Sequence, residues 1–255
     1  MRDLRILAWD TATDFNCAAL IYLSAAGDCL ALEEFQSERG VQAQTLPPEL
    51  ARMLKKHSLR PADLDLLAVG RGPGSFTGLR SGLALAKGLA LGGGLPLMGL
   101  ASTETLAGLM LFEDQTAAGD FLAAPLIDAR HREIFTALYQ ARPGGGPPAL
   151  EELWPPQALP PAEIPRRLSA AARGRPVRLA GPALDLLLAA LPGGLPDGLS
   201  PGPAGLAPRA AMLARLAGLR YQRDESAAAL YPPLPLYIRQ PDLRRSGAAP
   251  GPEIT

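Results

Sequence analysis

The stretch that decides the fold is Gly70-Arg71-Gly72-Pro73-Gly74-Ser75-Phe76-Thr77-Gly78-Leu79-Arg80. It follows a short apolar run at 66–69, which predicts a buried strand, and it leads into a helix-like apolar run at 81–91. A strand, a glycine-rich turn and a helix in this order indicate an α/β protein. Exposed amides and hydroxyls at a helix start attract phosphate. The same turn would equally suit the presentation of a surface to another protein.

Strands and helices alternate along the rest of the chain. Further strands are expected at 4–9, 17–23, 29–35, 96–100, 121–127, 133–139 and 177–180. Further helices are expected at 46–57, 105–112, 161–172, 183–191 and 210–221, with a Pro- and Gly-rich loop at 191–208. Each half begins with a strand that ends in an aspartate, Asp10 or Asp128, and continues into a hairpin. The pattern predicts a duplicated α/β unit whose second copy is trimmed.

Composition predicts a globular chain without a basic field. The 255 residues are 47% hydrophobic, and 25 Lys and Arg balance 25 Asp and Glu. This balance argues against a protein that grips nucleic acid by itself. Arg166, Arg167, Arg173 and Arg175 are either scattered solvated arginines or an addition to a partner's RNA surface. Because no signal region or membrane span is recognisable, we expect a cytoplasmic protein without membrane contact.

The sequence predicts no catalytic residue and no metal site. His57 and His131 are the only histidines, and neither has a His or Cys partner at the spacing of metal ligands. The string Gly72-Pro73-Gly74-Ser75-Phe76 lacks the second glycine of a hydrolase nucleophile turn. These observations disfavour a metalloprotease or a serine hydrolase.

Two groups of residues are nevertheless candidates for binding. The polar turn after the first strand and the glycine-rich turn predict a nucleotide or phosphate site, although the first is equally well explained as a capped turn. Its residues would be Asp10, Thr11, Thr13, Gly72, Gly74, Ser75, Thr77 and Gly78. The helix at 81–91 is apolar around most of its circumference, which indicates either a partner interface shared with the helix at 46–57 or an internal core. The interface side chains would be Leu50, Met53, Leu54, Leu83, Ala86, Leu89 and Ala90.

Four strings give the chain a family resemblance. The glycine-rich string, Ile6-Leu7-Ala8-Trp9-Asp10-Thr11-Ala12-Thr13, Ile127-Asp128-Ala129-Arg130 and Pro235-Leu236-Tyr237-Ile238-Arg239 occur in the order and spacing of bacterial TsaB proteins. The chain therefore resembles the TsaB family, from Leu4 to about Arg239. It departs from the family at 39–45, where relatives often carry a polar segment with a histidine.

The resemblance implies an actin-like, heat-shock-protein-like fold of two ribonuclease-H-like lobes, the second of them reduced. We expect a first lobe at 1–103 and a reduced second lobe at 104–209. A helix and strand at 210–241 would return to the first lobe, and a tail at 242–255 would be disordered.

The resemblance also implies a function. TsaB is the non-catalytic partner, a pseudoenzyme, of TsaD, which transfers a threonylcarbamoyl group to an adenosine of tRNA. We expect a heterodimer with TsaD, joined by the ATPase TsaE, and a homodimer when the chain is alone. Contact with tRNA would occur only through the complex. No cofactor is expected, apart from weak ATP or ADP binding in the complex. The alternative is a nucleotide-dependent kinase or ATPase of the actin-like superfamily.

Overall fold

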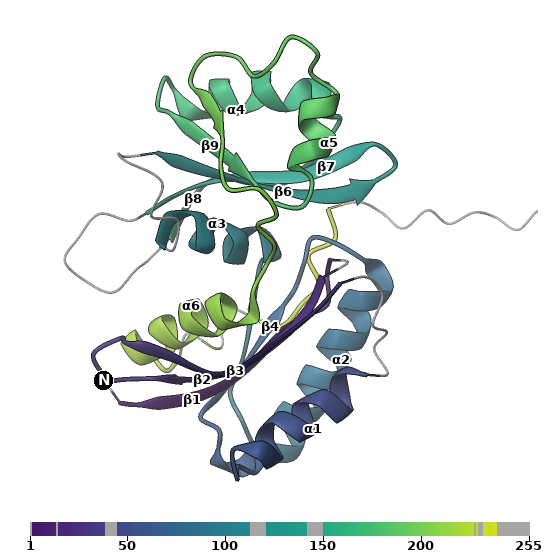
Figure 1. The fold of residues 1–255 in the computed structure, drawn as a ribbon. Coiled ribbons are helices and arrows are strands. Elements are labelled where there is room, and N and C mark those ends of the chain that lie inside the picture. Colours follow the sequence, from purple (N-terminus) through teal and green to yellow (C-terminus); the bar gives the residue numbers. More distant parts are fainter. Residues whose placement is uncertain are drawn as a thin grey trace, which may run out of the picture.

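The computed structural model describes residues 2–13, 15–38, 45–112, 121–141, 150–226, 228 and 232–238. These residues form two lobes, each built on a five-stranded sheet (Figure 1). All but the last residue of the departure at 39–45, and the whole of the predicted disordered tail at 242–255, lie outside the described residues. Among the described residues, no helix has the length and apolar character needed to cross a membrane.

The first sheet has the strand order β3-β2-β1-β4-β5. Its strands are β1 (Leu4–Asp10), β2 (Phe15–Leu23), β3 (Cys29–Glu38), β4 (Leu66–Gly70) and β5 (Leu97–Leu100). The hairpins β1–β2 and β2–β3 are antiparallel, whereas β4 pairs in parallel with both β1 and β5. This is a ribonuclease-H-like sheet.

The second sheet repeats the first, in the order β10-β9-β6-β7-β8. Its strands are β6 (Leu122–Arg130), β7 (Glu133–Ala141), β8 (Leu150–Leu159), β9 (Val177–Ala180) and β10 (Leu199–Pro201). Antiparallel and parallel pairs occur at the equivalent positions. The predicted duplication is therefore confirmed.

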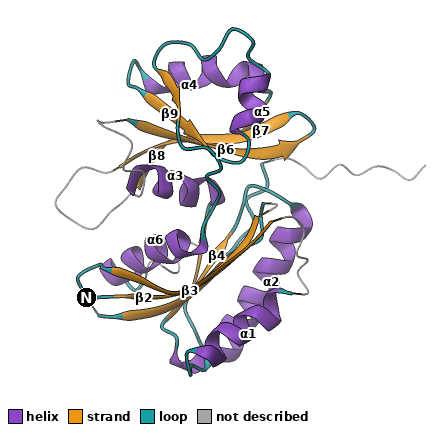
Figure 2. Ribbon diagram, in the orientation of Figure 1, coloured by secondary structure: helices purple, strands orange, loops and turns teal. Residues whose placement is uncertain are grey.

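The helices form three layers around the two sheets (Figures 1 and 2). The outer layers are α1 (Leu46–Lys56) and α2 (Phe76–Gly93) on the first sheet, and α4 (Ile164–Ala172) and α5 (Leu184–Ala189) on the second. Short 3-10 turns lie at Pro61–Asp63 and Pro161–Glu163. The outer helices of the second lobe are the shorter pair, so the second lobe is the reduced one.

The middle layer contains two exchanged helices. The helix α3 (Ser102–Phe112) directly follows a strand of the first sheet but packs on β6, β7 and β8 of the second. The helix α6 (Ala210–Arg223) follows the second sheet but packs on β1 and β2 of the first, and it also contacts α3. Each lobe therefore covers its inner face with a helix from the other half of the sequence.

Burial follows the two-residue alternation of the strands. In β1, Ile6 and Ala8 face the central core that contains α3 and α6, whereas Leu7 and Trp9 face the outer core under α1 and α2. The helix α3 is buried on nearly all sides, which explains why it is apolar throughout. The helix that is buried on nearly all sides is therefore α3, whereas α2 has an exposed face.

The structure corrects three element predictions. The strand β8 was missed because Pro155 and Pro156 interrupt its pattern, and proline is tolerated there because β8 is an edge strand. The predicted loop at 191–208 contains the short strand β10. The helix α2 begins at Phe76 and not at Ser81, because the Ser75 hydroxyl accepts a hydrogen bond from the Gly78 amide and caps the helix there.

Candidate functional site: two facing turns and the outer face of α2

The glycine-rich turn lies directly against the turn that follows β1. The amide of Ser75 donates to the carbonyl oxygen of Ala12 at 2.6 Å, and the Thr11 hydroxyl donates to the Gly78 carbonyl oxygen at 2.7 Å. The two turns on which the predicted phosphate site rests are thus hydrogen-bonded to each other.

Two glycines allow this contact. A Cβ atom at Gly74 would lie 1.9 Å from the carbonyl oxygen of Ala12, and one at Gly78 would lie 2.1 Å from that of Thr11. Real Cβ atoms do not approach an oxygen so closely. The glycines at these two positions are therefore explained by contact between the backbones of the two turns.

The Asp10 carboxylate is buried where β1 and β4 end side by side. Its Oδ1 accepts from the Ala12 amide at 2.8 Å, and its Oδ2 accepts from the Ser102 hydroxyl at 2.6 Å. A Cβ at Gly70 would lie 2.2 Å from the carboxyl carbon, so that glycine makes room for the side chain. Burial raises the pKa of Asp10 above its usual value, while the two hydrogen bonds oppose the shift.

The eight predicted phosphate-binding residues therefore gather on these two turns. Asp10, Thr11 and Gly72 are buried, whereas Ser75 and Thr77 are exposed. Because the turns hydrogen-bond to each other and both Asp10 oxygens have partners, the polar atoms mainly serve contacts within the protein. Nucleotide binding stays a prediction.

Sequence reasoning missed the partners of these turns. Ser102, which holds Asp10, begins α3 and carries no local signal for that contact. The C-terminal family string also returns to the glycine-rich turn, where the Leu236 amide donates to the Arg71 carbonyl oxygen at 2.7 Å. The Nε of Arg80 donates to the Tyr237 hydroxyl at 3.2 Å, and the Arg80 guanidinium lies 3.7 Å from the Phe76 ring centroid. Two of the four strings that carry the resemblance, the glycine-rich string and the C-terminal string, are therefore in contact.

The structure places most of the predicted interface side chains inside the first lobe. Five of them, namely Leu50, Met53, Leu54, Leu83 and Ala86, are buried in the outer core of the first lobe. Leu89 and Ala90 are partly buried against the same core. Apolar side chains of amphipathic helices pack toward their own sheet first, so these residues stabilise the lobe.

The exposed face of α2 carries other residues. Ala84, Lys87, Gly88, Leu91 and Gly92 lie on this face. The Leu91 side chain is 88% exposed, and a Cβ at Gly88 or Gly92 would meet nothing within 4 Å. An exposed leucine between small residues forms an apolar strip that another helix could approach closely.

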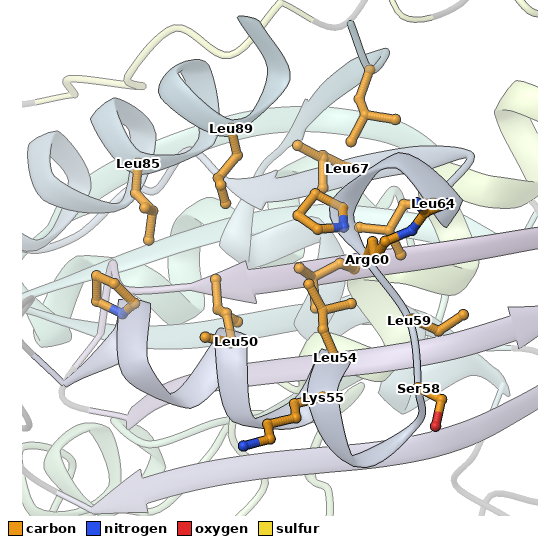
Figure 3. A pocket seen from close by; sticks show the side chains of 15 residues that line it. Leu50, Leu54, Lys55, Ser58, Leu59, Arg60, Leu64, Leu67, Leu85 and Leu89 are labelled. Atoms are coloured by element: carbon orange, nitrogen blue, oxygen red, sulfur yellow. The ribbon is translucent and has the colours of Figure 1, made fainter. Parts of the chain in front are cut away.

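An apolar cavity of about 480 Å³ separates α1 from α2 (Figure 3). Leu50 and Leu54 of α1 face Leu85 and Leu89 of α2 across it, and Leu67 of β4 also lines it. The cavity explains why Leu85 and Leu89 are only partly buried. It extends the apolar surface of α2 toward α1.

Within the described ranges, no three His, Cys, Asp or Glu side chains are grouped so that they could hold a metal ion.

Comparisons with known proteins agree with these features. The family model described as "TsaD: tRNA N6-adenosine threonylcarbamoyltransferase" matches residues 42–145. The tRNA threonylcarbamoyladenosine biosynthesis protein TsaB of Escherichia coli (strain K12) is 37% identical over 142 residues, covering 56% of this chain and 58% of the relative. TsaB of Bacillus subtilis (strain 168) is 34% identical over 110 residues, covering 43% of this chain and 44% of the relative. The matched part spans about half the length of these curated relatives.

The two ribonuclease-H-like lobes with exchanged helices define an actin-like α/β protein. YeaZ from Pseudomonas aeruginosa has this fold over its whole length, with a TM-score of 0.70 and 27% identity over 93% of the present chain. The chain is similar in sequence to the TsaB proteins of Escherichia coli and Bacillus subtilis, and similar in fold to YeaZ.

Proposed function

We propose that this chain is the non-catalytic partner subunit of the complex that makes threonylcarbamoyladenosine in tRNA. It would bind the catalytic subunit TsaD as a heterodimer, with TsaE joining the complex, and would reach tRNA through that complex. The names of the TsaB relatives support the pathway. The location would be the cytoplasm.

The observation that carries the partner role is the exposed face of α2. Leu91 is 88% exposed beside two glycines, on an 18-residue helix that contains no acidic residue. A buried leucine adds about 1.5–3 kcal/mol compared with an exposed one, so a partner that covers this face gains stability. We propose that the partner of this face is TsaD, or a second copy of the chain when TsaD is absent.

The pseudoenzyme role is supported by the state of Asp10. A metal ion that bridged Asp10 to a phosphate would need carboxylate lone pairs directed at it, and each Asp10 oxygen already accepts one hydrogen bond inside the protein. We propose that the chain has no cofactor of its own and that any weak ATP or ADP binding belongs to the assembled complex.

The proposal is tested with Leu91→Asp. Because Leu91 makes little contact inside the chain, the variant should keep the thermal stability of the wild type. Its carboxylate would be buried without a partner in the heterodimer, so co-elution with TsaD in size-exclusion chromatography with light scattering should be lost.

The matched control is Leu186→Asp, because Leu186 is 39% exposed on α5 in the other lobe. This variant should still form the heterodimer. A heterodimer that tolerates Leu91→Asp would exclude the α2 face as the interface, and two separate peaks for the wild type would reject the partner role itself.

A further inference from the structure

The outer face of the second lobe carries a group of arginines that make no ion pair among the described residues, although Glu163 and Asp185 lie at the two ends of the segment that contains them. Residues 164–184 contain five arginines and no acidic residue. Arg166 and Arg167 lie on α4, Arg173 is its C-cap residue, and Arg175 lies in the turn before β9. These four side chains, which we call the arginine face, are all exposed.

Six arginines elsewhere in the described part of the chain pair with carboxylates, whereas others, such as Arg80, which donates to the Tyr237 hydroxyl, do not. Arg52 pairs with Glu33 and Glu49, and Arg60 pairs with Asp63. Ion pairs of this kind are also made by Arg2, Arg130, Arg209 and Arg220. Across the part of the chain that the structure describes, no member of the arginine face makes such a pair.

Two members of the face are held by neutral side chains. Arg175 donates to Gln140 Oε1 at 2.6 Å, and Arg167 donates to Gln157 Oε1 at 3.3 Å. An amide oxygen orients a guanidinium without cancelling its charge. These two glutamines lie on β7 and β8, so the sheet positions the arginines beside α4.

We propose that the arginine face binds the phosphate backbone of RNA, and that it contacts tRNA while the α2 face contacts TsaD. The inference rests on the proposed function, which supplies tRNA as the polyanion. Guanidinium groups form paired hydrogen bonds with phosphate oxygens, and exposed Arg along one helix is the typical footprint of a backbone contact. The chain is neutral overall, so this contact is local and adds to the affinity of the complex.

The position of the face permits both contacts at once. In Figure 1, α4 lies at one end of the molecule, and α1 and α2 lie at the other, with both sheets between them. A partner on α2 therefore leaves the arginine face open.

The test measures the affinity of the complex with TsaD for unmodified tRNA by fluorescence anisotropy at several NaCl concentrations. The quadruple variant Arg166→Gln, Arg167→Gln, Arg173→Gln, Arg175→Gln should bind more weakly and with a smaller salt dependence. The loss of four phosphate contacts lowers the slope of log binding constant against log salt concentration by about 3. Raising the salt from 50 to 200 mM should therefore weaken binding by the variant roughly 50- to 150-fold less than it weakens binding by the wild type.

The matched control is Arg2→Gln with Arg130→Gln, which removes two exposed arginines that are ion-paired. It should retain the wild-type slope, and the double variant Arg167→Gln, Arg175→Gln should lower it by about 2. The inference is overturned if the quadruple variant binds with the wild-type slope, if the control loses as much, or if the quadruple variant no longer co-elutes with TsaD. A wild-type chain that fails to form the complex rejects the proposed function as well.

Discussion

At the scale of single residues, the Asp10 side chain has a structural role, because it connects two segments of the protein by hydrogen bonds. Asp10 joins its own turn, through the Ala12 amide, to the start of α3, through Ser102. The sequence predicts that Asp10 and the glycine-rich turn lie together. It could not predict that Ser102 is the partner, because this contact forms only when α3 begins beside the end of β1.

Replacing Asp10 tests this role. Asp10→Asn keeps an acceptor for the Ala12 amide and removes a buried charge, so the free energy of unfolding at neutral pH should equal or exceed that of the wild type. Asp10→Ala leaves two polar groups without their partner and should cost about 2–4 kcal/mol. Urea denaturation of both variants measures the difference. Equal losses would show that the hydrogen bonds contribute nothing.

The raised pKa of Asp10 also predicts a pH dependence. The native state holds this proton more tightly than the unfolded chain, whose value is near 3.8. Burial of the charge therefore costs nothing below that value, and the free energy of unfolding falls as the pH rises through the native pKa. This fall should be present in the wild type and smaller in Asp10→Asn, which keeps the contribution of Glu152, whose pKa burial also raises. Urea midpoints measured from about pH 4 to pH 8 compare the two proteins.

At the scale of elements, the apolar pattern of a helix does not reveal which neighbours cover it. The pattern of α2 indicated burial on all sides, yet α3 holds that position and α2 keeps an exposed face. Local signals located most elements, because alternation and helical period are properties of a short window. They missed β8, where prolines interrupt the alternation, and they could not show the exchange of α3 and α6, which depends on contacts between distant segments.

The glycines of α2 provide a test at this scale. Gly88 is an exposed position inside the helix with open space around it, so Gly88→Ala should raise the free energy of unfolding by about 0.5–1 kcal/mol. Gly74→Ala, by contrast, places a methyl group on the Ala12 carbonyl and should destabilise the chain strongly. Thermal unfolding compares the two. A destabilising Gly88→Ala would mean that the face is already covered.

At the scale of the whole molecule, the exchanged helices join the lobes into one cooperative unit. The central core contains side chains of both sheets together with α3 and α6. Across it, Glu104 of α3 pairs with Arg220 of α6, and the Tyr139 hydroxyl of β7 lies 3.1 Å from the Thr103 hydroxyl oxygen. Neither lobe has a complete inner face without the other half of the sequence.

The two tryptophans of the chain report on this cooperativity. Trp9 lies in β1 of the first lobe and Trp154 lies in β8 of the second. We expect the single-tryptophan variants Trp9→Phe and Trp154→Phe, each unfolded in urea, to follow by fluorescence the same transition that circular dichroism records for that variant. A fluorescence midpoint that departs from the circular dichroism midpoint in either variant would show that the lobes unfold separately.

The exchange of α3 and α6 also determines where the polypeptide can be divided. A fragment that stopped before Ala210 would expose the inner face of its first sheet, including Ile6, Leu23 and Leu66, to water. A fragment that began after Phe112 would lack the helix that supports the second sheet. A ribosome that has not yet reached Ala210 therefore holds an incomplete, aggregation-prone intermediate, and the synthesis of α6 completes the first lobe.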